Sequence, residues 1–500
     1  MTSFTSADLA FLQRSVDTFD VAAWGARGDG VTDDTAAIQA AINAAAAAGG
    51  GTVKLSPGTY IVSAPLSVEA NSIHIAGAGP GATVLSPTSL TADVITAGLT
   101  GTRTDLSVRG LTIGGAAPRT AGAAVHWGTV FRGHVEDCDL IAPFNGVYLS
   151  GPSSIIYLRG IYIVNVTPAT GVGVYMNGFA NDVYLSDVLM DNPPASQPFA
   201  GIRLSSASGI WLTDCDILHA GHGLRVDPPA SQTVQWLFAL NCAFDSCAIA
   251  GVYINASTAT STITGLQFTA CWTSSNGMTG TTAAVSGIHG LVVLGAAGST
   301  INGLSFVGHR AFVNTGDGML INAGNDILVE AAQASGNSAP PTAAAAYQGI
   351  AIGGTVNGCQ VIGCRSGQMA GFANTQNYGI AVIGATPTNY LIATNDVRSN
   401  VAPNPLLDQG TTTQKNIRDN LGFNPIGYLG ALAVPASGTT FDNPSGADAT
   451  VYLAGGTISA VVVGGSTTGV VATPATVHVP AGSNITLTYT VAPTWTWFAD

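Results

Sequence analysis

The sequence predicts an all-β protein: a right-handed parallel β-helix with a short N-terminal helical cap and a small C-terminal antiparallel β-sandwich. Two recurring phrases support this prediction. In the first, a glycine precedes an apolar, a variable and an apolar residue. It returns at spacings of mostly about 27 to 31 residues, a period typical of stacked repeats, at Gly146, Gly173, Gly201, Gly223, Gly251, Gly290, Gly318, Gly349 and Gly379. The second phrase precedes the glycines and holds, at its shared position, Cys138, Val188, Cys215, Cys242 and Cys271.

Both phrases have the pattern of β-strands. Apolar residues alternate with variable ones, and Gly, Asn, Asp and Pro stand at the ends. A strand, a turn, a second strand and a long loop in each period describe one coil of a parallel β-helix. Each coil buries its apolar residues only against the coils above and below it, so many coils share one continuous core.

Composition indicates a folded chain with a buried core and argues against two kinds of partner. Charged residues make up 9 % of the 500 residues and hydrophobic ones 46 %, yet no apolar run reaches the length of a membrane span. The formal net charge is −13, and lysine occurs only at Lys54 and Lys415, so the basic stripe that nucleic-acid binding needs is missing. We therefore expect no nucleic-acid partner and no membrane span.

The cysteines bear on cofactors, and the N-terminus bears on location. Cys138, Cys215, Cys242, Cys271 and Cys364 share one repeat position, which favours a stack of small buried thiols over a disulfide frame or a metal site. We expect no metal and no other cofactor.

The first residues lack the basic and apolar regions of a signal peptide, so the sequence predicts synthesis in the cytoplasm.

Residues 1–18 are predicted to be a docking segment. They contain a short amphipathic helix from Ala7 to Arg14. Such a helix is too short to be stable alone, so we expect it to pack on a partner chain or a larger assembly.

Residues 19–85 are predicted to open and cap the β-helix. A glycine-rich turn leads to a helix that Thr32 or Asp33 caps, with acidic residues in its first turn, and Gly49-Gly50-Gly51 ends it. The buried stripe of this helix consists of Ile38, Ala41, Ile42 and Ala45. Asp29, Asp33 and Asp34 are interpreted as capping and turn residues rather than catalytic ones.

This segment, from Phe19 through Gly28-Asp29-Gly30 to Thr59-Tyr60-Ile61, closely resembles the opening motif of the pectate-lyase and polygalacturonase superfamily. Many phage tail-spike proteins share the motif. The resemblance covers residues 19–85, and the coil phrases extend it through a predicted β-helix at 86–425. It implies the right-handed β-helix fold and its N-terminal cap.

Residues 426–500 are predicted to form the β-sandwich. They contain no Lys or Arg, and strand-like runs alternate with Gly- and Pro-rich turns. The segment resembles small C-terminal modules of phage tail proteins, which implies trimer formation or capping of the β-helix end. Its aromatic end, Trp495-Thr496-Trp497-Phe498, is expected to be exposed on the surface of this unit and to pack against a neighbour.

A candidate glycan-binding surface follows from the first phrase. Its variable residue points outward, and successive coils stack about 4.8 Å apart, so these residues should form one column: Tyr148, Tyr175, Arg203, Arg225 and Tyr253, followed by smaller or aliphatic residues. Aromatic faces stack on sugar rings and arginine binds carboxylates. Trp272, directly after Cys271, is a further glycan-binding candidate. The alternatives are a cation–π ladder that stabilises the sheet and an interface with a second chain.

Candidate catalytic residues lie after the cysteine position. Asp191 and Asp245 occupy equivalent outward positions two coils apart, roughly 9–10 Å by stacking distance, near the upper end for an inverting pair of one acid and one base. Asp216, the outward residue directly after Cys215, is a further candidate. The alternative is that these are solvated loop acids.

Gly221-His222-Gly223 resembles the Gly-His-Gly signature of polygalacturonases, which implies that His222 assists the catalytic aspartates. The chain lacks that family's Asn-Thr-Asp and paired aspartates, so His222 as a turn residue is the alternative. His309 stands at the interior cysteine position and is expected to lie in the core.

These features together predict a virion tail-spike or tail-fibre subunit. We expect a homotrimer that binds a host surface polysaccharide and depolymerises it, by hydrolysis rather than by lyase chemistry. Its N-terminus would dock on a tail or baseplate assembly. One alternative is a free, extracellular polysaccharide hydrolase or lyase. Another is an adhesive or structural spike without catalysis.

Overall fold

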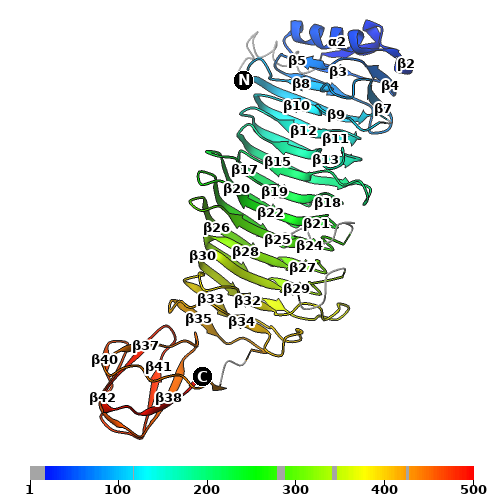
Figure 1. Cartoon of the computed structure of the whole chain (residues 1–500). Helices are drawn as coiled ribbons and strands as arrows, with labels where there is room; N and C mark the ends of the chain where they lie inside the picture. Colours follow the sequence, from blue (N-terminus) through cyan, green and yellow to red (C-terminus); the bar gives the residue numbers. More distant parts are fainter. Residues whose placement is uncertain (1–16, 116, 279–287, 341–345, 424–426, 500) are drawn as a thin grey trace, which may run out of the picture.

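The computed structural model of the chain describes residues 17–115, 117–278, 288–340, 346–423 and 427–499. It is an elongated parallel β-helix with a helical cap at one end and a small antiparallel unit at the other (Figure 1). The predicted fold class is confirmed. The predicted docking helix at Ala7–Arg14 lies outside the described residues.

The β-helix has three faces, which we call faces A, B and C and define by which strands pair from coil to coil. Face A contains β1 (Thr18–Asp20), β3 (Gly51–Lys54), β6 (Ile73–Ala76), β17 (Ala207–Thr213), β20 (Thr233–Leu240), β23 (Thr262–Thr269), β26 (Thr300–Val307), β33 (Tyr390–Ala393) and β35 (Lys415–Arg418). Face B contains β2 (Asp29–Asp33), β4 (Gly58–Val62), β7 (Thr83–Pro87), β18 (Asp216–Leu218), β21 (Ala243–Asp245), β24 (Trp272–Ser274), β27 (Arg310–Phe312), β29 (Gln333–Ser335) and β31 (Arg365–Ser366).

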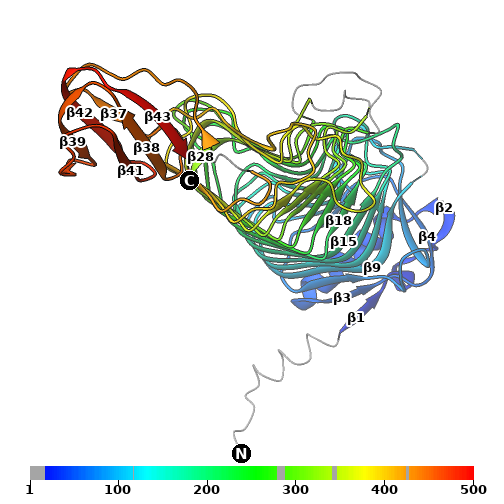
Figure 2. The ribbon, with the colours of Figure 1, turned by 90° about the horizontal axis from the view of Figure 1, so that it is seen from below.

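Face C contains β5 (Leu66–Val68), β8 (Ile95–Ala97), β10 (Ala123–Trp127), β12 (Asn145–Leu149), β14 (Val172–Met176), β16 (Ala200–Leu204), β19 (His222–Val226), β22 (Ala250–Ala256), β25 (His289–Gly295), β32 (Ile380–Val382) and β34 (Leu406–Asp408). Longer strands turn a corner. Those that run from face A to face B are β9 (Arg103–Gly114), β11 (Val130–Ile141), β13 (Ser154–Val164) and β15 (Ala180–Asp191). Those that run from face C to face A are β28 (Met319–Glu330) and β30 (Ile350–Ile362). Viewed along the axis, the coils superpose (Figure 2).

The corner between faces A and B depends on a left-handed backbone residue in each coil. Asp137, Asp187 and Asp214 take this position with φ of 50°, 53° and 52°. Asp and Asn tolerate this conformation better than other non-glycine residues, because their short side chains hydrogen-bond locally. These three aspartates are therefore turn residues at the corner.

Inside the coils, equivalent residues stack on one another. Cys215, Cys242 and Cys271 occupy one interior column on successive coils. All seven cysteines are buried and free, which confirms the predicted buried thiols at the shared repeat position. His309 follows Cys271 in that column with no exposed surface, so its assignment to the core is confirmed.

The N-terminal cap contains the 3-10 helix η1 (Val21–Trp24) and helix α2 (Thr35–Ala48), whose buried residues are the predicted stripe. Gly49 ends α2 in the left-handed conformation. The predicted start is wrong by one or two residues: Asp34 is the N-cap, and the first turn carries no acidic residue. The carboxylate of Asp34 instead accepts the amides of Arg27 and Gly28, at 2.7 and 3.1 Å, and so fixes the glycine-rich turn.

The C-terminal unit is the predicted sandwich of two antiparallel sheets. One contains, in order, β36 (Gly427–Tyr428), β43 (Thr494–Ala499), β38 (Ala449–Ala454) and β41 (Ala475–Val479). The other contains β37 (Thr440–Asp442), β42 (Asn484–Val491), β39 (Thr457–Val463) and β40 (Ser466–Thr467). The expectation of an exposed aromatic end is wrong for both tryptophans. Trp495 and Trp497 are 8 % and 0 % exposed because alternate residues of β43 point into the sandwich's own core.

Candidate functional site

Face C presents the predicted column of aromatic and arginine side chains. The pairing register joins Tyr148 to Tyr175, Tyr175 to Arg203, Arg203 to Arg225 and Arg225 to Tyr253. The Tyr148 and Tyr175 rings stack with centroids 5.3 Å apart. The guanidinium of Arg203 lies 5.0 Å from the Tyr175 ring and that of Arg225 lies 4.5 Å from the Tyr253 ring. These five side chains therefore lie on one side of the β-helix, and their contacts also form the cation–π ladder of the alternative reading.

The two arginines of this column share one carboxylate, which sequence reasoning missed. Asp227 accepts two hydrogen bonds from Arg203, at 2.9 and 2.8 Å, and one from Nε of Arg225 at 2.7 Å. Its side chain is 8 % exposed. Burial lowers the pKa of Arg203, but the hydrogen bond and charge of Asp227 outweigh it and raise that pKa overall. Two guanidinium groups on one carboxylate leave one net positive charge at this point of the column.

His222 lies on face C and contacts Arg225 of this pair. Its side chain is nearly buried, and burial, followed by the charge of Arg225, lowers its pKa to about 4. Nδ1 donates to the carbonyl of Phe199 at 3.3 Å, and Nε2 accepts from Arg225 at 3.2 Å. The structure thus gives His222 the geometry of a neutral group that positions Arg225. It does not bring His222 into hydrogen-bond contact with Asp191, Asp216 or Asp245.

Those three aspartates come together on face B, at the end of β15, the start of β18 and the end of β21. Asp191, Leu218 and Asp245 occupy one outward column on three successive coils. Asp216 lies on the middle coil, two residues before Leu218. The pKa of Asp216 is raised, first by burial and then by the charges of Asp245 and Asp191. Asp216 therefore holds a proton more readily than an ordinary aspartate, and its two neighbours stand on the adjacent coils.

Each flanking aspartate has its own hydrogen-bond donors. Oδ1 of Asp191 lies 2.8 Å from Nδ1 of His219, and Oδ1 of Asp245 accepts from the hydroxyl of Ser274 at 3.1 Å. A carboxyl group with a raised pKa next to hydrogen-bonded carboxylates is the arrangement that general acid–base catalysis needs. His219 was missed from sequence, although it stands only three residues before the Gly-His-Gly histidine.

Trp272 extends this face B group by one more coil. The register places Asp216, Ala243 and Trp272 in one outward column. The indole is 38 % exposed and meets Phe312 edge to face at 5.6 Å. Because the residue between Asp216 and Trp272 is an alanine, the column has only a methyl group there, and the indole stands next to the aspartates with no large side chain between them.

A second aromatic column, on face A, was missed. The rings of His134, Tyr157, Tyr184, Trp211 and Phe238 stack in sequence, with centroids 4.8, 5.0, 4.6 and 5.6 Å apart. The sequence did contain a signal for this column, because its last four residues recur at a constant interval: Tyr157, Tyr184, Trp211 and Phe238. The ring faces are occupied by one another, so this column holds coils together and offers a ligand mainly ring edges.

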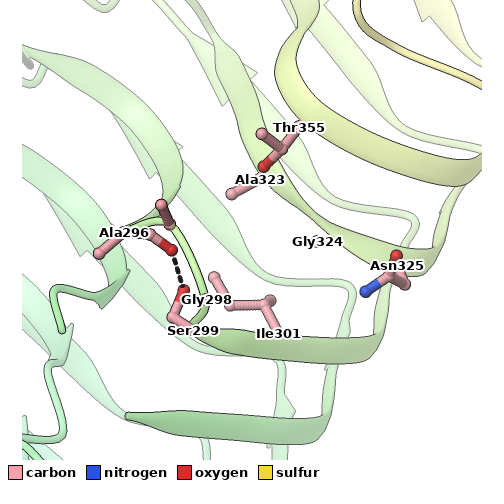
Figure 3. A pocket seen from close by; sticks show the side chains of 9 residues that line it. Ala296, Gly298, Ser299, Ile301, Ala323, Gly324, Asn325 and Thr355 are labelled. Carbon is pink, nitrogen blue, oxygen red and sulfur yellow. Dashed lines mark hydrogen bonds between the residues drawn. The ribbon is translucent and has the colours of Figure 1, made fainter. Parts of the chain in front are cut away.

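The hollow drawn in Figure 3 has no titratable side chain in its lining. A hollow between the 296–299 turn and β28 is lined by small neutral residues and Asn325, with the Ser299 hydroxyl bonded to the carbonyl of Ala296 (Figure 3). Within the described ranges, no three His, Cys, Asp or Glu side chains are grouped to hold a metal ion. No helix in those ranges is long and apolar enough to cross a membrane.

The fold is a right-handed parallel β-helix, and comparison with known proteins supports that fold and a pectate-lyase-like N-terminal part. Residues 18–147 match the family described as "Rhamnogalacturonase A/epimerase, pectate lyase-like". The predicted resemblance to that superfamily is thereby confirmed.

Curated relatives resemble the N-terminal part. Mannuronan C5-epimerase AlgE2 of Azotobacter vinelandii is 55 % identical over 74 residues, 13 % of this chain and 7 % of that protein. Mannuronan C5-epimerase AlgE4 of the same organism is 40 % identical over 133 residues, 24 % of this chain and 23 % of that protein. The matched stretches thus span less than a quarter of these relatives.

Solved structures share the fold over a longer stretch. The Dettilon tailspike protein aligns with a TM-score of 0.57 and 12 % identity, covering 100 % of this chain and 97 % of that one. The tailspike of E. coli bacteriophage HK620, solved with a pentasaccharide, aligns with a TM-score of 0.54 and 13 % identity over 100 % and 95 % of the two chains. The AlgE4 A-module of Azotobacter vinelandii gives 0.51 and 18 % identity over 81 % and 99 %.

Proposed function

We propose that this chain is a tail-spike or tail-fibre-like protein that binds a cell-surface polysaccharide and hydrolyses it at face B. The observation that carries the proposal is the group formed by Asp191, Asp216 and Asp245, in which burial and then the charges of the two flanking carboxylates raise the pKa of Asp216. Asp216 is the general acid that protonates the leaving oxygen of a glycosidic bond. Asp191 or Asp245 is the base that activates water.

The neighbouring side chains supply the binding surface. Trp272 lies two coils beyond Asp216 in the same outward column and offers an indole face to a sugar ring. On face C, Tyr148 and Tyr175 give a second aromatic surface, and the arginine pair with its net positive charge suits an acidic sugar. The likeness to tailspikes over the whole chain, one of them solved with a pentasaccharide, supports a polysaccharide ligand and a tail-spike role. We propose that the spike is a homotrimer on a virion tail.

The test is release of oligosaccharides from candidate cell-surface polysaccharides by the purified chain. Asp216→Asn should abolish release, and Asp214→Asn, at the corner two residues before, should not. Equal release by both variants would remove Asp216 from the mechanism. Binding without release by the unaltered chain would favour the adhesive spike. A stable monomer in solution would count against the trimeric spike and for a free extracellular enzyme.

A second candidate, C5 epimerisation of a polyuronate, is favoured by the N-terminal likeness to mannuronan C5-epimerases. Epimerisation exchanges one carbon-bound proton and leaves the chain length unchanged. Incubation of a polyuronate in deuterated water separates the two: deuterium at C5 without new reducing ends indicates epimerisation, and new reducing ends without deuterium indicate hydrolysis.

A further inference from the structure

Three polar side chains on successive coils of face C form a hydrogen-bonded line near the N-terminal end of the aromatic column. Asp93 lies two residues before the start of β8, His126 lies in β10 and Ser150 directly follows β12. Oδ2 of Asp93 lies 2.8 Å from Nδ1 of His126, and Nε2 of His126 lies 2.7 Å from Oγ of Ser150. Asp93 is held in place by a further hydrogen bond, from the amide of Ala123 at 2.8 Å.

We propose that Asp93, His126 and Ser150 are a catalytic triad that hydrolyses acyl esters, and that its substrate is an ester-linked acyl group, such as acetyl, on a sugar hydroxyl. A nucleophile within hydrogen-bond reach of a base, with the base oriented by a third group, is the arrangement that activates a serine. The acyl chemistry rests on this geometry alone. Only the assignment of the ester to a glycan rests on the proposed function.

The hydrogen bonds fix the protonation state that the reaction needs. The carboxylate of Asp93 accepts the proton on Nδ1, so Nε2 is the unprotonated nitrogen that faces the Ser150 hydroxyl. Burial raises the pKa of Asp93, but the hydrogen bond and charge of His126 together with the Ala123 amide lower it overall, so Asp93 stays ionised. An ionised Asp93 stabilises the imidazolium that forms during the reaction.

The reaction balances with water as the only co-reactant. Oγ of Ser150 attacks the acyl carbonyl carbon and its proton moves to Nε2 of His126. The bond between that carbon and the sugar oxygen then breaks, and the sugar oxygen takes the proton from His126, which leaves an acyl-serine. Water attacks the acyl-serine and gives one proton to His126. The free acid leaves, and Ser150 regains its proton.

An oxyanion donor stands on the next coil. The amide of Ser150 is already bonded to the carbonyl of Trp127 at 2.9 Å, so it is not free for the substrate. Asn177 follows Met176 as Ser150 follows Leu149, and the register pairs Met176 with Leu149. The exposed Asn177 makes one long bond, from Nδ2 to the Tyr148 hydroxyl at 3.3 Å, which leaves a second amide hydrogen for a developing oxyanion.

The surroundings favour an ester displayed on a large molecule. The His126 and Asp93 side chains keep 16 % and 22 % of their surface exposed, so the line of residues is open to solvent. The ring of Tyr148 lies 4.8 Å from that of His126 and stacks in turn on Tyr175. A glycan lying along this column would bring its ester groups past Ser150.

The test begins with the whole chain and two probes that need no glycan, 4-nitrophenyl acetate and a fluorophosphonate that labels activated serines. We expect a label on the peptide that contains Ser150, and acetate ester hydrolysis that falls at least about 100-fold in Ser150→Ala and His126→Gln. Asp93→Asn should also lower the rate, because it takes away the charge that stabilises the imidazolium. No label at Ser150, with equal hydrolysis by the unaltered chain and Ser150→Ala, would overturn the triad.

The chain provides a matched control. Ser107 lies 3.0 Å from Nδ1 of His74 on face A, but no carboxylate in the described chain is hydrogen-bonded to the other nitrogen of His74. Ser107→Ala should leave labelling and hydrolysis unchanged, whereas loss of both would point to a general effect on the fold. Thermal unfolding of Ser150→Ala, which removes one hydroxyl, checks that its fold is intact.

The glycan assignment is tested separately, by measuring acetate and reducing ends in the same incubation with an O-acetylated polysaccharide. Acetate release that depends on Ser150 supports the assignment, whether or not the chain is cut. A label at Ser150 without acetate release from any O-acetylated polysaccharide that the chain binds would overturn the glycan assignment. New reducing ends without acetate would uphold the proposed depolymerase and count against the ester substrate.

Discussion

Nδ1 of His219 lies 2.8 Å from Oδ1 of Asp191. His219 directly follows β18 and has a left-handed backbone, with φ of 51°, which turns its ring back towards face B. The ring is 22 % exposed and the carboxylate 47 %, so the contact restrains a carboxylate that would otherwise move in solvent. His219 is therefore a positioning residue for the acidic group.

We expect His219→Ala to lower the kcat of polysaccharide cleavage by about 10- to 100-fold, the cost of a misplaced catalytic group. KM should change little, because the histidine does not line the aromatic surfaces. His219→Gln keeps a donor and should restore part of the rate. His134→Ala is the control, because His134 contacts Glu136 on face A. Steady-state kinetics checks this, and equal kcat for His219→Ala and the unaltered chain would contradict it.

Asp216→Asn should lower polysaccharide cleavage but raise the stability of the chain at neutral pH. Loss of the general acid should lower cleavage by roughly 10² to 10⁴-fold. Burial and the charges of Asp245 and Asp191 raise the pKa of Asp216 in the folded chain, so stability falls as pH rises from the unfolded to the folded value. The variant should therefore be more stable than the unaltered chain at neutral pH, by roughly a few tenths of a kcal/mol because the site is half exposed and screened.

The measurements are oligosaccharide release and urea unfolding, each at pH 7 and near pH 4. The stability gain of Asp216→Asn should shrink at the lower pH, where a larger share of the unaltered Asp216 carries its proton. Asp214→Asn provides the comparison, because Asp214 is an exposed corner residue that accepts from Asn241. A loss of stability in Asp216→Asn at neutral pH would show that its carboxylate is held by attraction rather than repulsion.

Asp227→Asn should destabilise the chain by about 2 to 4 kcal/mol, because it leaves two partly buried guanidinium groups without their shared counter-charge. Arg203 and Arg225 would then repel one another on adjacent coils. Chemical unfolding measures the loss. Asp326→Asn, which has no ion pair in the described chain, should change stability by only a few tenths of a kcal/mol. A similar small change in Asp227→Asn would mean that solvent already screens the arginines.

The column of Tyr148 to Tyr253 and the register of Asp191 and Asp245 were predictable because side-chain alternation and coil stacking fix them locally. The partners of these residues were not. Asp227 lies two residues beyond Arg225, where other coils carry Ser205 or Asn255, and no period marks it. His219 and His222 are three residues apart but face different sides, because the corner between faces B and C falls between them.

The triad on face C could not be predicted from the sequence either. Asp93, His126 and Ser150 come from three coils of unequal length, separated by loops that carry no motif. Each residue alone reads as an ordinary outward polar residue. Only the pairing of β8, β10 and β12 puts them in one line. Likewise, the alternation of Trp495 and Trp497 with threonine fitted a sandwich strand, but which face pointed inward depended on the partner sheet.

Trp211→Ala should lower the free energy of unfolding by about 2 kcal/mol, because the indole stacks on both Tyr184 and Phe238. Polysaccharide cleavage measured below the unfolding transition should stay unchanged, since this column lies on face A. Phe179→Ala, at a ring that is 47 % exposed, is the comparison. A loss of glycan binding in Trp211→Ala with its stability retained would instead make face A a binding surface.

Acid should destabilise the chain through its buried histidines. Burial lowers the pKa of His309 to about 3, from an ordinary value of 6.5, and that of His222 to about 4. Below about pH 6.5 the unfolded chain takes up protons that the folded chain cannot, so stability is lost as pH falls from there towards the folded values. At about pH 4.5 a single such group costs roughly 2 to 3 kcal/mol.

His309→Cys should remove much of that acid sensitivity. Position 309 continues the interior column of Cys215, Cys242 and Cys271, so the coil already accepts a thiol there. The variant loses the hydrogen bond between Oγ1 of Thr273 and Nε2 of His309, at 3.0 Å. It also removes Nδ1 of His309, a buried nitrogen that has no partner in the described chain. Stability at pH 7 should change by less than about 1 kcal/mol, while the loss between pH 7 and pH 4.5 should be visibly smaller. His478→Cys, at a mostly exposed ring, should leave that loss as it is. If His309→Cys loses as much stability on acidification as the unaltered chain, then protonation of His309 is not the cause of the acid destabilisation.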